Sequence, residues 1–122
     1  MARKKSARHQ RIESEMQRVL AELIAREVKD PRVGQVTLTL VEMQSDMSAA
    51  RVLYVPFGAQ HTAAEVQIGL TRAAGFLRGE VGRRLSLRHA PRLEFVLDES
   101  IERADRLTRL IDTAVRRDRK PS

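Results

Sequence analysis

The stretch from residue 70 to residue 95 constrains the fold most, because it combines a helical apolar face with a dense cluster of cations. Its apolar residues recur three or four positions apart, as on one side of a helix: Leu70, Ala73, Leu77, Val81 and Leu85. Residues 72–92 hold six arginines against a single acid, Glu80. Three glycines also fall in this span, and each costs about 1 kcal/mol relative to alanine in a helix interior. We therefore expect one helix, a break at Gly75, a second helix that is rich in arginine and runs to about Arg88, and then a strand.

An amphipathic helix is predicted near the start of the chain. Its apolar side consists of Ile12, Met16, Val19, Leu20, Leu23, Ile24 and Val28. Asp30-Pro31 ends it, since a residue that precedes proline avoids the helical region. A helix of this pattern is expected to cover a sheet.

Strands are predicted on both sides of the polar turn at residues 44–48. Residues 36–43 alternate apolar and polar side chains, and residues 50–57 form the returning strand of a hairpin. Pro56 confines the end of the second strand to an edge or a bulge. Thr62 and Glu65 have the spacing of a capping box, which starts the next helix.

The last elements are a strand over residues 92–97 and a terminal helix. Residues 98–100 cap this helix. Its apolar side consists of Ile101, Ala104, Leu107, Ile111 and Val115. Because it is less hydrophobic than the first helix, we expect it to dock only weakly.

The predicted order is α-β-β-α-α-β with an extra terminal helix, which gives an α+β fold with helices on one face of a three-stranded sheet. A type II KH domain has this order, and its two central helices are joined by a Gly-x-x-Gly loop that contacts RNA. Residues 79–82 match that loop literally. We reject the match because Glu80 would face phosphate and Val81 keeps the apolar register of a helix interior. The joint is expected instead at Ala73-Ala74-Gly75.

Positive charge is concentrated in two separated segments, and the whole chain has a formal net charge of +7. Residues 1–12 carry five basic groups and no acid, and the second segment is residues 72–92. Two such segments indicate a polyanionic partner. The cations predicted to contact it are Arg3, Lys4, Lys5 and Arg8 in the first segment and Arg72, Arg78, Arg83, Arg84, Arg88 and Arg92 in the second.

Three regions are expected along the chain: a basic flexible arm over residues 1–10, an RNA-binding domain over residues 11–100, and a helix with a basic tail over residues 101–122. The absence of cysteine excludes disulfides and thiolate metal sites. No apolar run reaches the length of a membrane-spanning helix or a signal peptide. A cytoplasmic protein is therefore expected. We also expect it to be a monomer.

Catalysis is not predicted. The three histidines, His9, His61 and His89, fall in an arm, a loop and a helix end and share no motif. The pair Asp98-Glu99 is explained by helix capping, and no phosphate-binding or nucleophile motif is present. We expect no enzyme activity, no metal and no cofactor. The alternative within binding proteins is a basic DNA-binding or nucleoid-associated protein.

The order and spacing of several short motifs resemble the bacterial ribosome-binding factor A family over about residues 8–101. These motifs are Arg11-Ile12 with Glu15, Asp30-Pro31-Arg32, Val36-Thr37-Leu38-Thr39, Asp46 with the strand at 50–55, Ala73-Ala74-Gly75-Phe76-Leu77-Arg78, Arg84-Leu85, Leu87-Arg88, Pro91, Leu93, Phe95, Asp98 and Ser100. Single motifs such as Asp-Pro-Arg are weak, whereas the full series is specific.

The resemblance implies a KH-like fold in which an Ala-x-Gly kink, at residues 73–75 here, replaces the Gly-x-x-Gly loop. It also implies binding to 16S rRNA on the 30S subunit, free or immature, in late maturation and 16S rRNA processing, with a link to growth in the cold.

Overall fold

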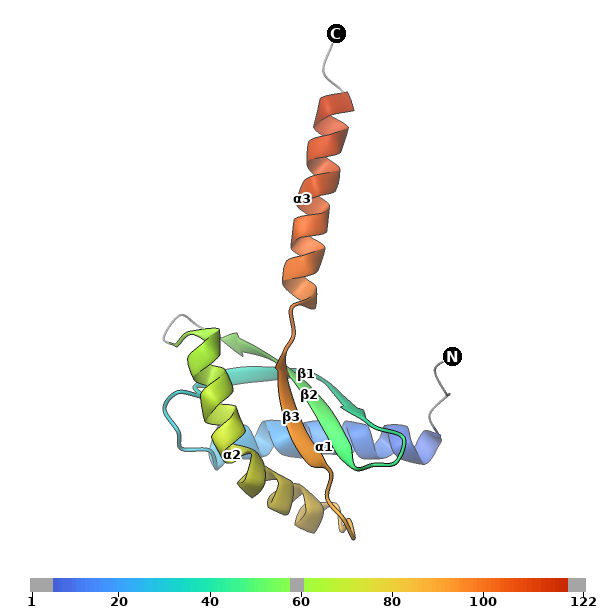
Figure 1. Cartoon of the computed structure of the whole chain (residues 1–122), viewed down its shortest axis with the longest axis vertical. Helices are drawn as coiled ribbons and strands as arrows, with labels where there is room; N and C mark the ends of the chain where they lie inside the picture. Colours follow the sequence, from blue (N-terminus) through green and yellow to red (C-terminus); the bar gives the residue numbers. More distant parts are fainter. Residues whose placement is uncertain (1–5, 58–60, 119–122) are drawn as a thin grey trace.

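The computed structural model describes residues 6–57 and 61–118, and in that part of the chain three helices accompany one three-stranded sheet (Figure 1). In chain order the elements are α1 (Ala7–Arg26), β1 (Gln35–Met43), β2 (Ala49–Phe57), α2 (Ala63–Arg84), β3 (Arg92–Leu97) and α3 (Ser100–Asp118). The predicted α+β class, with a three-stranded sheet and an additional C-terminal helix, is confirmed.

The sheet has β2 at its centre, with β1 antiparallel and β3 parallel to it. A parallel neighbour requires a crossover connection, and α2 supplies it. Pro56 lies opposite Val36 of β1, beyond the last pair between β2 and β3, which is Tyr54 with Leu97. The strand therefore has a free edge at Pro56, as the proline predicts.

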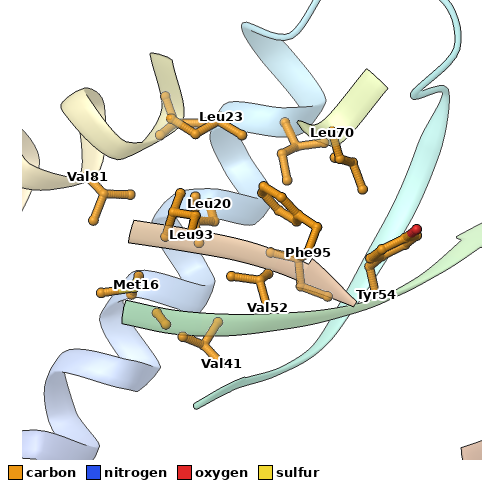
Figure 2. Close-up of a cluster of buried hydrophobic side chains, with 14 of the residues drawn as sticks. Met16, Leu20, Leu23, Val41, Val52, Tyr54, Leu70, Val81, Leu93 and Phe95 are labelled. Carbon is orange, nitrogen blue, oxygen red and sulfur yellow. The ribbon is translucent and has the colours of Figure 1, made fainter. Parts of the chain in front are cut away.

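One face of the sheet carries the core, and α1 and α2 both pack on it (Figure 2). The buried side chains labelled in the close-up are Met16, Leu20 and Leu23 of α1, Leu70 and Val81 of α2, and Val41, Val52, Tyr54, Leu93 and Phe95 of the strands. The opposite face is open to solvent. Glu42, Arg51 and Glu94 lie side by side there in one exposed cross-strand row.

Side chains of α1 also protect the free edge of β1. The Gln17 Nε2 donates to the Leu38 carbonyl at 2.9 Å, and the Glu13 carboxylate accepts from the Met43 N–H at 2.6 Å. His9 Nε2 lies 3.3 Å from the Met43 carbonyl. These three residues are spaced four apart on one helix face. They satisfy edge groups that would otherwise be open to pairing with another chain.

The helix α1 begins earlier than predicted. Ser6 is its N-cap, and the Ser6 side chain accepts a hydrogen bond from the His9 N–H at 3.1 Å. Ala7 to Gln10, which were assigned to a flexible arm, therefore belong to α1. Serine is a strong N-cap, and its signal was overlooked within a basic run. Residues 1–5 lie outside the described part of the chain.

The predicted break at Gly75 is wrong, because α2 is one helix of 22 residues. It changes direction along its length, but its backbone stays helical (Figure 1). Leu70, Leu77 and Val81 are all completely buried, so one apolar stripe continues across the predicted joint. Packing of this stripe on the sheet outweighs the modest helix penalty of the glycines.

Nothing around Gly75 requires a glycine. Among the described glycines only Gly34 has a positive φ, and a Cβ added at Gly75 would meet no atom within 4 Å. Ala73 and Ala74 beside it are half-buried on the same unbroken helix. Residues 79–82 also lie inside α2, so the rejection of a Gly-x-x-Gly loop at that position is confirmed.

The C-terminus of α2 lies at Arg84 and not near Arg88 as predicted. The Ser86 N–H donates to the Arg83 carbonyl at 3.3 Å, and the Leu87 N–H donates to the Gly82 carbonyl at 2.9 Å. These bonds and the positive φ of Ser86 (53°) form a Schellman motif. The signal was missed because glycine usually occupies the left-handed position and here serine does.

Helix α3 follows β3 and projects away from the rest of the molecule (Figure 1). Every residue from 100 to 115 is exposed, including five large apolar side chains: Ile101, Leu107, Leu110, Ile111 and Val115. The expectation of weak docking agrees with this arrangement.

Candidate nucleic-acid interface

A hollow of about 620 Å³ opens where three segments meet: the start of α1, the turn between β1 and β2, and the connection from α2 to β3. Its lining residues are Arg8, Asp46, Met47, Ser48, Arg78, Ser86, Leu87, Arg88, His89 and Ala90. Three of the predicted cations, Arg8, Arg78 and Arg88, therefore share one site although they come from separate parts of the chain.

The connection from α2 to β3 positions two of these arginines. Arg78 Nε donates to the Ala90 carbonyl at 3.0 Å, which ties the last turns of α2 to the connection. The Schellman reversal at Ser86 ends the helix before Arg88, so Arg88 lies on the rim of the hollow and not on the helix surface.

The turn between β1 and β2 forms the opposite wall. The Gln44 N–H donates to the Ala49 carbonyl at 2.9 Å, and Met47 has a φ of 62°. Asp46 Oδ1 accepts from both the N–H of Ser48, at 3.0 Å, and the Oγ of Ser48, at 2.7 Å. These bonds lower the pKa of the Asp46 carboxyl, so it is ionised at neutral pH.

The arginines in the hollow differ from several of the other predicted cations because they have no ion-pair partner. Within the described residues, Arg8, Arg78 and Arg88 form no ion pair with any carboxylate. Guanidinium groups without an internal counter-charge keep most of their donors available for phosphate oxygens, and Arg78 commits only its Nε, to the Ala90 carbonyl.

Arg83, Arg84 and Arg92, in contrast, have partners. The Glu80 carboxylate is 2.5 Å from Arg83 and 3.7 Å from Arg84, and the Glu94 carboxylate is 3.0 Å from Arg92. Their positive charge is therefore partly neutralised within the protein. The structure does not bring them into the hollow.

The remaining predicted cations lie elsewhere. Arg72 is exposed on α2 and contributes, as a lesser cause, to the low pKa of Asp30 in the connection from α1 to β1. That pKa is lowered to about 2 mainly because Arg32 donates to the Asp30 carboxylate from its side chain and its backbone. Arg3, Lys4 and Lys5 lie outside the described residues.

Comparison with known proteins places the chain in a family. The family model described as Ribosome-binding factor A matches residues 8–111. A protein called ribosome-binding factor A from Azoarcus sp. strain BH72 is 48% identical over 115 residues, which cover 94% of this chain and 91% of that protein. The chain belongs to the ribosome-binding factor A family.

Solved structures of ribosome-binding factor A agree with this assignment. The crystal structure of the Thermus thermophilus protein superposes with a TM-score of 0.67 at 29% identity, and it covers 75% of this chain and 97% of that one. A homology model of the Thermus thermophilus protein was fitted into a cryo-EM map of its complex with the 30S subunit. It has a TM-score of 0.62 at 30% identity and covers 73% of this chain and 93% of that one. The KH-like fold implied by the sequence is thereby confirmed.

For this member of the ribosome-binding factor A family, sequence reasoning missed the wall formed by the β1–β2 turn. The hairpin carries little basic charge, so none of its residues was among the predicted contacts. The structure brings the two together, since β3 pairs with β2 and the Arg92 N–H donates to the Ser48 carbonyl at 2.9 Å. The Asp-x-Ser spacing predicts a turn, but only the parallel pairing places that turn beside the arginines.

Neither a metal site nor a membrane span is found among the described residues. No three His, Asp, Glu or Cys side chains gather there in a way that could hold a metal ion. No helix in that part of the chain is both long enough and apolar enough to cross a membrane.

Proposed function

We propose that this protein binds the small ribosomal subunit through 16S rRNA and assists late 30S maturation, including 16S rRNA processing, as a non-catalytic cytoplasmic monomer. The observation that carries the proposal is the convergence of Arg8, Arg78 and Arg88, none of them ion-paired within the described residues, on one hollow. Family membership and the 30S complex of the Thermus thermophilus relative support it. A role in growth at low temperature is part of the same proposal.

Phosphate contacts dominate the expected binding. The chain has only four aromatic residues, so few stacking platforms are available, whereas unpaired guanidinium groups form bidentate bonds with phosphate. The logarithm of the binding constant should therefore fall linearly with the logarithm of the salt concentration. The slope decreases in magnitude by roughly 0.7–0.9 for each phosphate that a variant no longer neutralises.

Two charge-matched triple variants test the proposal. The change of Arg8, Arg78 and Arg88 to glutamine removes the unpaired cations, and the change of Arg83, Arg84 and Arg92 to glutamine removes three paired ones. Cosedimentation with small subunits over a series of salt concentrations gives affinity and slope for each. We expect the first variant to lose at least about tenfold in affinity and about two units of slope, and the second to lose clearly less.

Thermal unfolding of both variants controls for folding, because Arg78 also bonds the Ala90 carbonyl. Equal losses in the two variants would contradict the assignment of the hollow as the contact site. Competition by duplex DNA at matched salt separates the ribosomal function from a nucleoid-associated one. Displacement of small subunits by duplex DNA at equal concentration would favour the latter.

A further inference from the structure

The hollow contains a feature that phosphate binding does not use. Asp46 is an ionised carboxylate that lines the same hollow as the three arginines, and a negative charge there repels a phosphate group. A surface that contacts only the RNA phosphate groups would bind them more tightly without this carboxylate.

Hydrogen bonds from Ser48 hold the Asp46 carboxylate in place through one of its two oxygens. Oδ1 accepts both bonds from Ser48, so its two lone pairs are occupied. None of the other described residues donates a hydrogen bond to Oδ2 or forms an ion pair with it, although three arginines line the same hollow; besides Ser48, the backbone N–H of Asp46 itself is a lesser partner of the carboxyl. Oδ2 is therefore an acceptor that remains available to a ligand.

The size and the other walls of the hollow suit one RNA nucleotide. Its volume of about 620 Å³ falls within the range of small-molecule sites, roughly 300–1,000 Å³. Met47, Leu87 and His89 supply apolar and flat surfaces beside the cations. RNA bases that leave the stack are bound on such surfaces and recognised by their Watson–Crick edges.

The acceptor discriminates between the four bases. Guanine presents two adjacent donors, N1–H and N2–H, which can both approach Oδ2. Adenine and cytosine each place a ring-nitrogen acceptor next to their amino group, and uracil flanks its single N–H with two carbonyl oxygens. An acceptor-only carboxylate repels each of those neighbouring lone pairs.

We propose that the hollow binds one unpaired guanosine of RNA, with its phosphate on Arg8, Arg78 and Arg88 and the N1–H and N2–H of its base on Asp46 Oδ2. This inference rests on the proposed function, since it assumes that the hollow contacts RNA, and it adds the identity of the nucleotide. Binding is then partly sequence-selective in a protein whose charge alone predicts non-specific contacts.

Single-stranded pentanucleotides test the proposal. Four uridine-rich RNAs that differ only in the central base (G, A, C or U) are titrated by fluorescence anisotropy at about 50 mM salt, where phosphate contacts are strong. The wild type is expected to bind the guanosine RNA about tenfold more tightly than the others, which is the size of effect that a good two-bond base contact gives.

Asp46→Asn is the decisive variant. Asparagine keeps an Oδ1 that accepts from Ser48, so the turn is retained, but its Nδ2 replaces the free acceptor by a donor. We expect the guanosine preference to disappear even if overall affinity rises through the lost negative charge. Asp105→Asn on α3 is the matched control: it makes the same change of charge at a residue that does not line the hollow, so it should retain the preference.

The outcomes separate the two proposals. Equal binding of the four RNAs by the wild type, or a preference that survives in Asp46→Asn, overturns the guanosine site and leaves small-subunit binding untouched. Failure of all four RNAs while small subunits still bind overturns it as well. Failure of both the pentanucleotides and the small subunits contradicts the proposed function itself.

Discussion

Helices α1 and α3 have nearly the same length, 20 and 19 residues, and both have one apolar side, yet they end in opposite environments. α1 buries five residues, Met16, Val19, Leu20, Leu23 and Ile24, against the sheet. α3 has no buried residue between positions 100 and 115 (Figure 1). An apolar stripe indicates that burial would be favourable, but it does not say whether a partner surface is present.

The difference arises because only one face of the sheet carries the core. α1 and α2 cover that face, so no part of it is left for α3, which follows β3. Its start is also fixed: the Asp98 N–H donates to the Tyr54 carbonyl at 2.8 Å, and the Asp98 carboxylate accepts from Thr39 Oγ1 at 2.5 Å. The body of the protein, residues 7–97, is therefore expected to fold and unfold without α3.

Equivalent leucines of α1 and α3 should differ most in their contribution to the free energy of unfolding. Leu20 is completely buried and Leu107 is 59% exposed. Leu20→Ala should lower the free energy of unfolding by about 2–5 kcal/mol, and Leu107→Ala should change it by less than about 0.5 kcal/mol. Urea unfolding is followed by the fluorescence of Tyr54, the single tyrosine of a chain without tryptophan, which reports the body alone. A similar cost for both changes would mean that α3 packs on the body in solution.

A similar contrast exists within α2, which has one packed face and one exposed face. A Cβ at Gly69 would lie 2.7 Å from Val33 Cγ2, whereas a Cβ at Gly75 would meet nothing within 4 Å. Gly69→Ala should therefore destabilise the protein by about 1–3 kcal/mol through overpacking. Gly75→Ala should stabilise it by up to about 1 kcal/mol, since alanine is the better helix former.

Thermal unfolding of the two alanine variants measures both effects. Loss of stability in Gly75→Ala would instead support the hypothesis that residues 73–75 form a functional kink that requires glycine. Small-subunit binding of the same variant is expected to be unchanged, because Gly75 does not line the hollow.

The dependence of stability on pH should involve Asp30, a carboxylate of the body, and not Asp105, a carboxylate of α3. The folded pKa of Asp30 is about 2, below its ordinary value of 3.8, so its stabilising contribution is present above pH 3.8 and is lost as the pH falls through 2. In Asp30→Asn, the urea midpoint should decrease less between about pH 4 and pH 2 than in the wild type. The control is Asp105→Asn on α3, which removes an exposed pair with Arg109 at 2.8 Å and should leave the pH dependence unchanged. Identical pH profiles for wild type and Asp30→Asn would contradict the role of Asp30.

Removal of α3 should change the free energy of unfolding least. A chain that ends at Glu99 should unfold within about 0.5 kcal/mol of the full chain, because surface changes away from packed features rarely exceed that value. The comparison is made by the Tyr54 fluorescence described above. A clear loss of stability would show that the apolar stripe of α3 contacts the body.

The local elements of this protein could be predicted from its amino-acid sequence. The first helix, the hairpin strands, the capping box at Thr62 and Glu65, and the third strand were all recognisable, because periodicity and capping depend on residues close together in the chain. The sequence also narrowed the candidate site to ten cations. It could not sort those cations, since an arginine has the same local pattern whether it is ion-paired or free.

Contacts between distant parts of the chain determine which arginines converge and which glycines are closely packed. The parallel pairing of β3 with β2 brings the β1–β2 turn to the basic stretch and forms the hollow, and no local signal encodes that pairing. Gly69 and Gly75 are alike in sequence, but one faces Val33 and the other faces solvent. The physical reason is common to both cases: ion pairing and close packing act between residues that are distant in the chain, and their free energies depend on distances that exist only after folding.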